Sequence, residues 1–180
     1  MFIPNDIFTI LSDYYLTYRP FNKGDMEIIA QYTHEDEQFV FAKKHHVDVE
    51  ESPDLFVLDK NLKIKYITSM SATFSACFAV DSAILGDNRI IFGQYSDTMY
   101  NWEKEKMMDV SLKSIEFTFK DKSTIRHEFR HDDIYFIVAD TDSKIIDVKV
   151  FEGNDKEAVS TINDIIINEK KKFTHINELN

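Results

Sequence analysis

The sequence predicts an α+β fold, in which a five-stranded antiparallel sheet carries helices on one face. A helical spacing of apolar residues opens the chain, and five later segments have strand patterns, the first as a short apolar run and the others by alternation of apolar and polar residues. The chain has 180 residues, a length that favours one domain with helical additions. We therefore expect an N-terminal helical extension over 1–50, a core over 54–153 and a C-terminal amphipathic helix over 155–180.

The N-terminal extension is expected to contain two helices. Apolar residues at positions 7, 10, 11, 14 and 18 lie on one helical face, which Asn5 or Asp6 can cap and Pro20 ends. A second short helix is predicted over 25–30. Residues 34–49 are compatible with a helix or with a strand. Their acidic start suits a helix dipole, whereas Phe39-Val40-Phe41 suits a strand.

The core is expected to begin with a hairpin of 55–58 and 63–68 around the turn Asp59-Lys60-Asn61. After a loop at 86–88, residues 97–110 keep helical spacing, with Asp97 as a plausible cap. Residues 115–119, 125–129 (resuming at 134–138) and 145–151 alternate as three further strands. We expect them to lie beside the 55–68 hairpin in one antiparallel sheet.

The segment 155–180 carries a short heptad stripe. Asp155 can cap a helix whose apolar residues are Val159, Ile162, Ile166, Phe173 and Ile176. Such a stripe suits docking or homodimerisation. The alternative is a single amphipathic helix packed on its own domain.

Composition and charge exclude several classes of protein. There are 21 Lys and Arg against 32 Asp and Glu, so the net charge of −11 repels phosphate backbones, and we expect no direct nucleic-acid binding. The single cysteine, Cys77, permits no internal disulfide. With no signal-peptide pattern and no apolar run of about 20 residues, we expect a cytoplasmic protein that does not enter a membrane.

Two motifs of the core resemble those of the PAS domain family. Ser52-Pro53-Asp54-Leu55-Phe56-Val57-Leu58-Asp59 with 63–68 is similar to its opening hairpin, and 134–140 with 144–148 is similar to its closing strands. Residues 84–108 resemble the segment before and along its connecting helix. Thr68, Asp147 and 153–155 depart from the family pattern.

The resemblance implies a sensory or regulatory module. Such a module would bind a small, largely apolar ligand between sheet and helices, form a homodimer through flanking helices, and act on a transcriptional or signalling output protein. A helix-turn-helix output domain would need a longer segment after the core than this sequence provides.

No catalytic, cofactor or metal site is expected. Cys77 lacks the sequence context of a flavin photosensor, and 97–110 holds no histidine for a haem. His127 and His131 would lie about 13 Å apart on a strand, too far to share one ion. The sequence also lacks a nucleophile elbow, a phosphate-binding glycine loop and a His-Glu-x-x-His motif, so we do not expect an enzyme.

Aromatic residues provide the one functional signal, since the chain has 15 Phe, 8 Tyr and one Trp. If the core encloses a pocket, aromatic walls suit an apolar or aromatic small molecule. Tyr100, Trp102 and His127 would supply the polar groups that orient it. The alternative is that the rings interlock as dry core. The expected ligand-binding residues are Tyr95, Tyr100, Trp102, Phe117, Phe119, His127, Phe129 and Tyr135.

Two other functions stay open. A ligand-free acidic interaction module, an adaptor or inhibitor, would bind a basic partner through its negative surface. The residues 22–27 also resemble part of a cone-shaped nuclear-transport-factor-like domain, in which an enzyme is a minor possibility. That fold needs a further helix before residue 70, which the sequence does not indicate.

Overall fold

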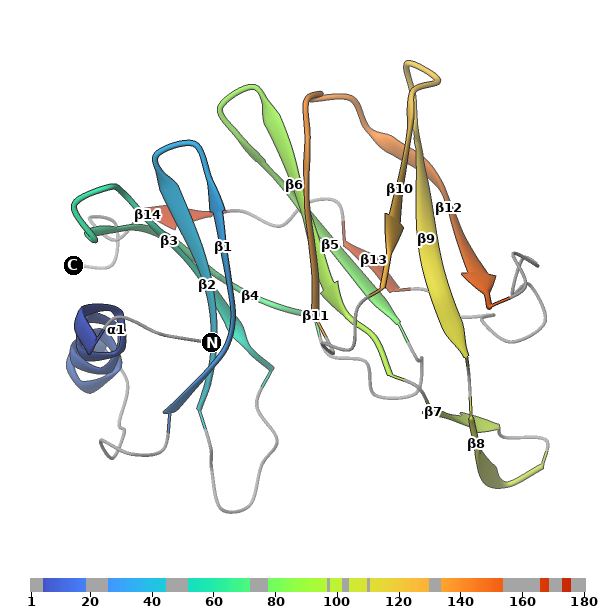
Figure 1. Cartoon of the computed structure of the whole chain (residues 1–180), viewed down its shortest axis with the longest axis horizontal. Helices are drawn as coiled ribbons and strands as arrows, with labels where there is room; N and C mark the ends of the chain where they lie inside the picture. Colours follow the sequence, from blue (N-terminus) through green and yellow to red (C-terminus); the bar gives the residue numbers. More distant parts are fainter. Residues whose placement is uncertain are drawn as a thin grey trace. The chain divides into compact units, whose positions relative to one another are not determined.

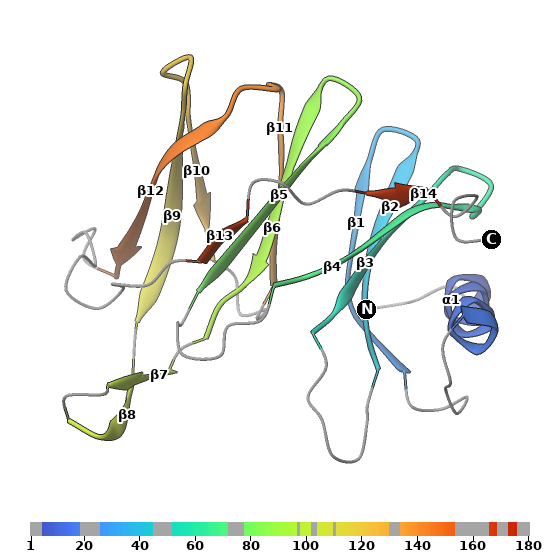
Figure 2. The ribbon, with the colours of Figure 1, turned by 180° about the vertical axis from the view of Figure 1, so that it is seen from behind.

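Strands, rather than helices, make up most of the described chain (Figures 1 and 2). The structure is a computed structural model that describes residues 5–18, 26–44, 52–71, 78–96, 98–101, 104–109, 111–129, 134–153, 166–168 and 173–175. The chain divides into two compact units. Unit 1 contains residues 1–69 and 173–180, and unit 2 contains residues 70–172.

Unit 1 is an antiparallel meander covered by a helix. Its strands follow the order β1-β2-β3-β4-β14. Their bounds are β1 Met26–His34, β2 Glu37–Lys44, β3 Asp54–Leu58, β4 Ile64–Ser69 and β14 Thr174–His175. The reverse view shows β14, in red, alongside β4 (Figure 2). The predicted hairpin of 55–58 and 63–68 is confirmed by β3 and β4.

Helix α1 (Asn5–Tyr18) packs on one face of this meander, as its apolar stripe predicts. Its buried residues Ile7, Leu11 and Tyr15 meet the strand residues Val40 and Phe56. The rings of Tyr14 and Tyr15 both meet Phe56 edge-on, with centroids 5.4 and 5.5 Å away, a favoured aromatic geometry. The contact of aromatic rings thus fixes the helix on the sheet.

A buried carboxylate joins the helix to two strands of unit 1. Asp54 accepts a hydrogen bond of 2.8 Å from the Tyr15 hydroxyl and one of 2.5 Å from the Ser69 hydroxyl. Its residue is almost fully buried at the start of β3. A buried charge needs such donors, because an unpaired one costs several kcal/mol or shifts to its neutral form.

Unit 2 consists of two packed sheets and a separate hairpin. Its larger sheet has the order β11-β6-β5-β13, in which β13 runs parallel to β5, and its smaller sheet has the order β10-β9-β12. The strands of the larger sheet are β5 Ala79–Leu85, β6 Asn88–Gln94, β11 Ile134–Ala139 and β13 Ile166–Asn168. Those of the smaller sheet are β9 Leu112–Phe119, β10 Thr124–Glu128 and β12 Ile145–Glu152, and the hairpin strands are β7 Thr98–Asn101 and β8 Lys106–Asp109.

The core of unit 2 lies between its two sheets. Val80, Ile91 and Ile137 of the larger sheet pack in one buried cluster with Ile115 and Val150 of the smaller sheet. Because side chains alternate across a strand, every second residue of each sheet points into this core.

Arg89 closes one end of this core. The residue is 4% exposed, and its guanidinium donates three hydrogen bonds to neutral acceptors. These are the Ser143 carbonyl at 2.6 Å, the Asp142 carbonyl at 2.7 Å and the Ser82 hydroxyl at 2.7 Å. Since the segment 140–144 joins β11 to β12, Arg89 holds the connection between the two sheets in place.

The predicted fold class is wrong. The strands of 55–68 belong to unit 1, whereas the segments of 115–151 supply β9, β10, β11 and β12 of unit 2. They do not share a single five-stranded sheet with helices on one face. The predicted boundaries near 50–54 and 153–155 also differ from the division at 69/70 and 172/173. The sheet implied by the PAS resemblance is therefore not the one that forms.

Two predicted helices are strands. Residues 25–30 fall largely in β1, where Met26, Ile28 and Ala30 are buried in strand alternation. Within 97–110, the apolar residues that kept helical spacing instead oppose one another across a hairpin, with Met99 beside Met108 and Tyr100 beside Met107. Glu105 at the turn has φ of 48°, a left-handed conformation that interrupts a helix.

Of the two alternatives for 34–49, the strand is confirmed for 37–44, since β2 contains Phe39-Val40-Phe41, and residues 45–49 lie outside the described residues. In the predicted C-terminal helix, 166–168 and 174–175 are strands, and the residues 155–165 lie outside the described residues.

We predict that Arg89→Met destabilises the protein by roughly 2–4 kcal/mol, because it leaves the buried Ser82 hydroxyl and two partly buried carbonyls without their charged donor. Urea unfolding at neutral pH measures this change. Arg126→Met is the matched control, since Arg126 is exposed on β10 and should cost about 1 kcal/mol or less. Equal losses in the two variants would contradict the closing role of Arg89.

Candidate functional site

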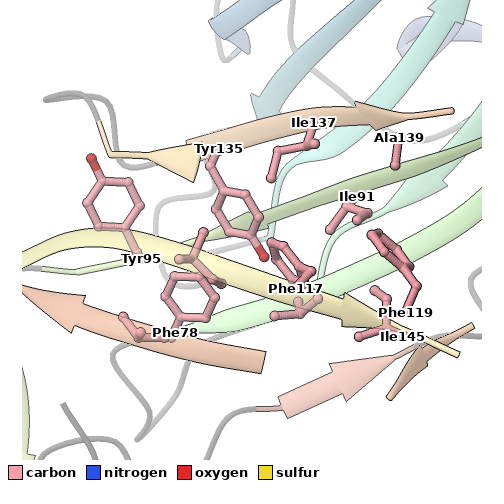
Figure 3. Close-up of a cluster of buried hydrophobic side chains, with 12 residues drawn as sticks. Phe78, Ile91, Tyr95, Phe117, Phe119, Tyr135, Ile137, Ala139 and Ile145 are labelled. Atoms are coloured by element: carbon pink, nitrogen blue, oxygen red, sulfur yellow. The ribbon is translucent and has the colours of Figure 1, made fainter. Parts of the chain in front are cut away.

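Six of the eight predicted ligand-binding residues gather in unit 2. Four are buried in its core, namely Tyr95, Phe117, Phe119 and Tyr135 (Figure 3). Phe129 packs against that core, and the ring of His127 lies 6.4 Å from the rings of both Phe129 and Tyr135. We call these six residues and Phe78 the aromatic cluster.

Ring-to-ring contacts link six members of the aromatic cluster, namely Phe78, Tyr95, Phe117, His127, Phe129 and Tyr135. Tyr135 stacks on Phe78 with centroids 5.1 Å apart, and Tyr95 stacks on Phe129 at 4.3 Å. Phe129 in turn meets Phe78 at 5.5 Å and Tyr135 at 6.0 Å. These separations are those of packed aromatic pairs, which fill the space between the rings themselves.

Tyr135 occupies the centre of the cluster because Gly93 has no side chain. The two residues oppose one another on β11 and β6. The Tyr135 ring crosses over Gly93, and its hydroxyl donates a 2.8 Å hydrogen bond to the Ala79 carbonyl on β5. A Cβ at Gly93 would overlap that carbonyl oxygen and would lie only 2.5 Å from the Tyr135 hydroxyl. One side chain thus spans three strands.

Burial raises the pKa of Tyr135 well above its ordinary value, and the negative charge of Asp81 adds to this shift. Tyr135 is 1% exposed. Asp81 is itself buried, and its carboxylate accepts two hydrogen bonds of 2.6 Å from Ser71, one from the backbone N–H and one from the hydroxyl. The Tyr135 phenol therefore stays neutral and serves as a hydrogen-bond donor.

The accessible part of the aromatic cluster is His127 on β10 and Phe129 directly after this strand, at one edge of the smaller sheet. Both are half-buried, as is Ile125, and the three alternate with the exposed Arg126 and Glu128. Tyr95, which stacks on Phe129, lies at one end of the row of labelled rings, and its hydroxyl points away from the others (Figure 3).

Two predicted site residues are not part of this arrangement. Tyr100 lies in β7, where the structure describes its backbone alone, and Trp102 lies outside the described residues. Of the three polar groups expected to orient a ligand, the structure brings His127 to the cluster.

Two residues at the centre of this arrangement, Phe78 and Gly93, are not among the residues that the sequence predicts for the site. Phe78 forms a single bridge with Tyr95 just before β5, in a stretch without clear periodicity. Gly93 did offer a signal, because a glycine inside an apolar strand often marks the close approach of another group.

The chemistry open to the cluster is narrow. Its rings supply apolar contact, and the Tyr135 hydroxyl already has an acceptor. Across the described ranges, no three His, Cys, Asp or Glu residues are arranged to hold a metal ion. In the same part of the chain, no helix has the length and apolar character needed to cross a membrane.

Comparison of the chain with protein-family models, with curated proteins and with solved structures finds no match in any of the three.

We predict that Gly93→Ala destabilises the protein by about 3 kcal/mol or more, because its Cβ overlaps backbone that cannot move without breaking the sheet. Gly153→Ala is the matched control, since a Cβ there meets nothing within 4 Å and its cost should stay within about 0.5 kcal/mol. Thermal and urea unfolding measure both. Similar midpoints for the two variants would contradict the close approach at Gly93.

A second prediction concerns the pH dependence of stability. The pKa of Tyr135 is raised in the folded state, so above pH 10, where unfolded tyrosine titrates, the unfolded state binds fewer protons. The free energy of unfolding of the wild type should therefore fall as pH rises beyond about 10.

Tyr135→Phe lacks this titration, although it loses a hydrogen bond worth about 1–2 kcal/mol. Urea unfolding between pH 8 and 11 should show the variant less stable at pH 8 and the difference narrowing at alkaline pH. A constant difference over that interval would contradict the assignment.

Proposed function

We propose that this chain acts by binding another protein, and that the β7–β8 hairpin of unit 2 is its contact surface. The sequence left such a protein-interaction module open as the alternative to a ligand sensor. The observation that carries the proposal is an exposed methionine on a hairpin that pairs with no other strand in the described part of the chain.

The packing of the aromatic cluster argues against a small ligand in the core. A ligand between these rings would have to separate pairs that already lie 4.3 to 6.4 Å apart, centroid to centroid. Ligand sensing stays a prediction that the ring distances do not favour. Homodimerisation also stays a prediction, but residues 166–168 and 174–175 of the expected C-terminal helix are strands.

The hairpin has the features of an interaction element. Met107 is 59% exposed and Met108 is half-buried, while Lys104, Glu105 and Lys106 around the turn are exposed. An apolar side chain surrounded by charges of both signs is typical of a protein contact site, and methionine adapts well to varied partner surfaces. Both views show the hairpin extending beyond the end of β9 (Figures 1 and 2).

The energetics of a hairpin support the same function. A two-stranded ribbon is marginally stable in water unless a further strand or surface packs on it. β7 and β8 form a sheet of two strands, with an outer edge on each. A partner that covers Met107, or that adds a strand to either edge, would supply the missing contacts.

The net charge indicates which partners associate fastest. With a charge of −11, the chain attracts a basic protein and repels nucleic acid at low ionic strength. The partner chemistry that fits is therefore a basic protein with an apolar groove. In such a complex the charges act on the association rate, and burial of Met107 acts on the dissociation rate.

Site-specific photo-crosslinking tests this function. We expect benzoylphenylalanine at position 107 of the full chain to form a discrete protein adduct in an extract of the cells that make it. The same group at position 146 is the matched control, because Ile146 is also 59% exposed in unit 2 but lies on β12. Met107→Ser should weaken binding of the partner so identified by about tenfold, or 1.4 kcal/mol.

Equal adducts at 107 and 146, or none at 107, would contradict the hairpin as the contact surface. Native mass spectrometry of the untreated chain provides a second readout. A small molecule retained at one copy per chain would favour ligand sensing instead.

A further inference from the structure

The outer edge of β5 is completed by a short segment from far along the chain. β13 pairs with it in parallel, and the register places Ile166 beside Ala79, Ile167 beside Val80 and Asn168 beside Asp81. β13 has three residues and β5 has seven, so the pairing covers about half of the edge. Along the rest of β5, in the described part of the chain, no strand pairs on that side.

The side chains of β5 are unusually buried for a strand at the edge of a sheet. Ala79, Val80, Asp81, Ser82 and Ala83 are all nearly inaccessible to solvent, so β5 has buried side chains on both faces. A strand of this kind is typical of a sheet interior rather than of an edge, and it pairs best with another apolar, β-branched segment. The sequence Ile165-Ile166-Ile167 has that character.

A ladder of three residues is held chiefly by being part of the same chain. Its few hydrogen bonds contribute little each, whereas covalent linkage gives the segment an effective concentration that can reach millimolar. An identical segment on another molecule has the same complementarity to β5. It lacks only the advantage of linkage, which is the condition under which proteins exchange elements between copies.

We propose that the outer edge of β5 is a strand-acceptor site, at which residues 166–168 of a second copy of this chain can replace the chain's own. Reciprocal exchange then gives a dimer in which each copy donates one strand and accepts one. This inference goes beyond the proposed function and does not depend on the hairpin, since β7 and β8 are separate from β5.

A peptide tests the acceptor half of the proposal. The probe is a fluorescein-labelled synthetic peptide of residues 163–171, added to the full chain and followed by fluorescence anisotropy. Ile167→Pro removes a backbone N–H from the chain's own segment and so frees the edge of β5. We expect this variant to bind the peptide at least tenfold more tightly than the wild type does. Ile167→Val, which keeps the N–H, should bind as weakly as the wild type.

Hydrogen exchange gives a readout that does not need the peptide. In Ile167→Pro, amides of residues 79–81 that donate to β13 should exchange faster, whereas amides of β9 should be unchanged and far-UV circular dichroism should match the wild type. Failure of the variant to bind the peptide, together with unchanged exchange in β5, would overturn the acceptor site.

Refolding tests the donor half. Wild type refolded from urea at high protein concentration should yield a dimer by size exclusion with light scattering, and Ile167→Pro should yield monomer because its segment cannot pair. Wild type that refolds to monomer alone at every concentration would overturn exchange between copies.

Discussion

The core of unit 2 depends on the bare backbone of β6 at Gly93. Across that position the ring of Tyr135 reaches from β11 to the Ala79 carbonyl of β5. Phe78 stacks on the Tyr135 ring. Phe129 meets the Tyr135 ring edge-on and in turn stacks on Tyr95, so the position of Tyr135 orders the rings around it. Burial keeps the Tyr135 phenol neutral, and its hydroxyl donates its hydrogen bond to the Ala79 carbonyl. The cluster is therefore better suited to holding the two sheets together than to binding a ligand.

The elements that the sequence predicts correctly are those with unambiguous local patterns. Helix α1 has a one-sided apolar stripe, and the β3–β4 hairpin has a short apolar run before an Asp-Lys-Asn turn and an alternating segment after it. Alternation also indicates which side chains of a strand face inward, and Phe117 and Phe119 are buried in the core as that pattern predicts. Whether inward-facing rings leave a pocket or fill it depends on distances of about 1 Å, which no periodicity encodes.

The wrong predictions arise where one pattern of apolar residues is compatible with two different structures. Apolar residues in 97–110 recur at helical spacing, yet the same residues face one another in a hairpin once Glu105 takes a left-handed conformation. Strand partners present a similar difficulty. The strands in 55–68 and 115–151 are predicted correctly, but their pairing is decided by long-range packing, and the segments belong to different units.

The position of β13 and β14 in the chain has a consequence for synthesis on the ribosome. β13 completes the edge of β5 in unit 2, and β14 completes the edge of β4 in unit 1. Both are translated after every strand that they pair with, so each nascent sheet displays an incomplete edge until translation reaches these residues. In that interval the growing polypeptide exposes two unpaired strand edges, which can pair with neighbouring nascent chains on a polysome. Holdase chaperones that cover these edges would be most effective at this stage.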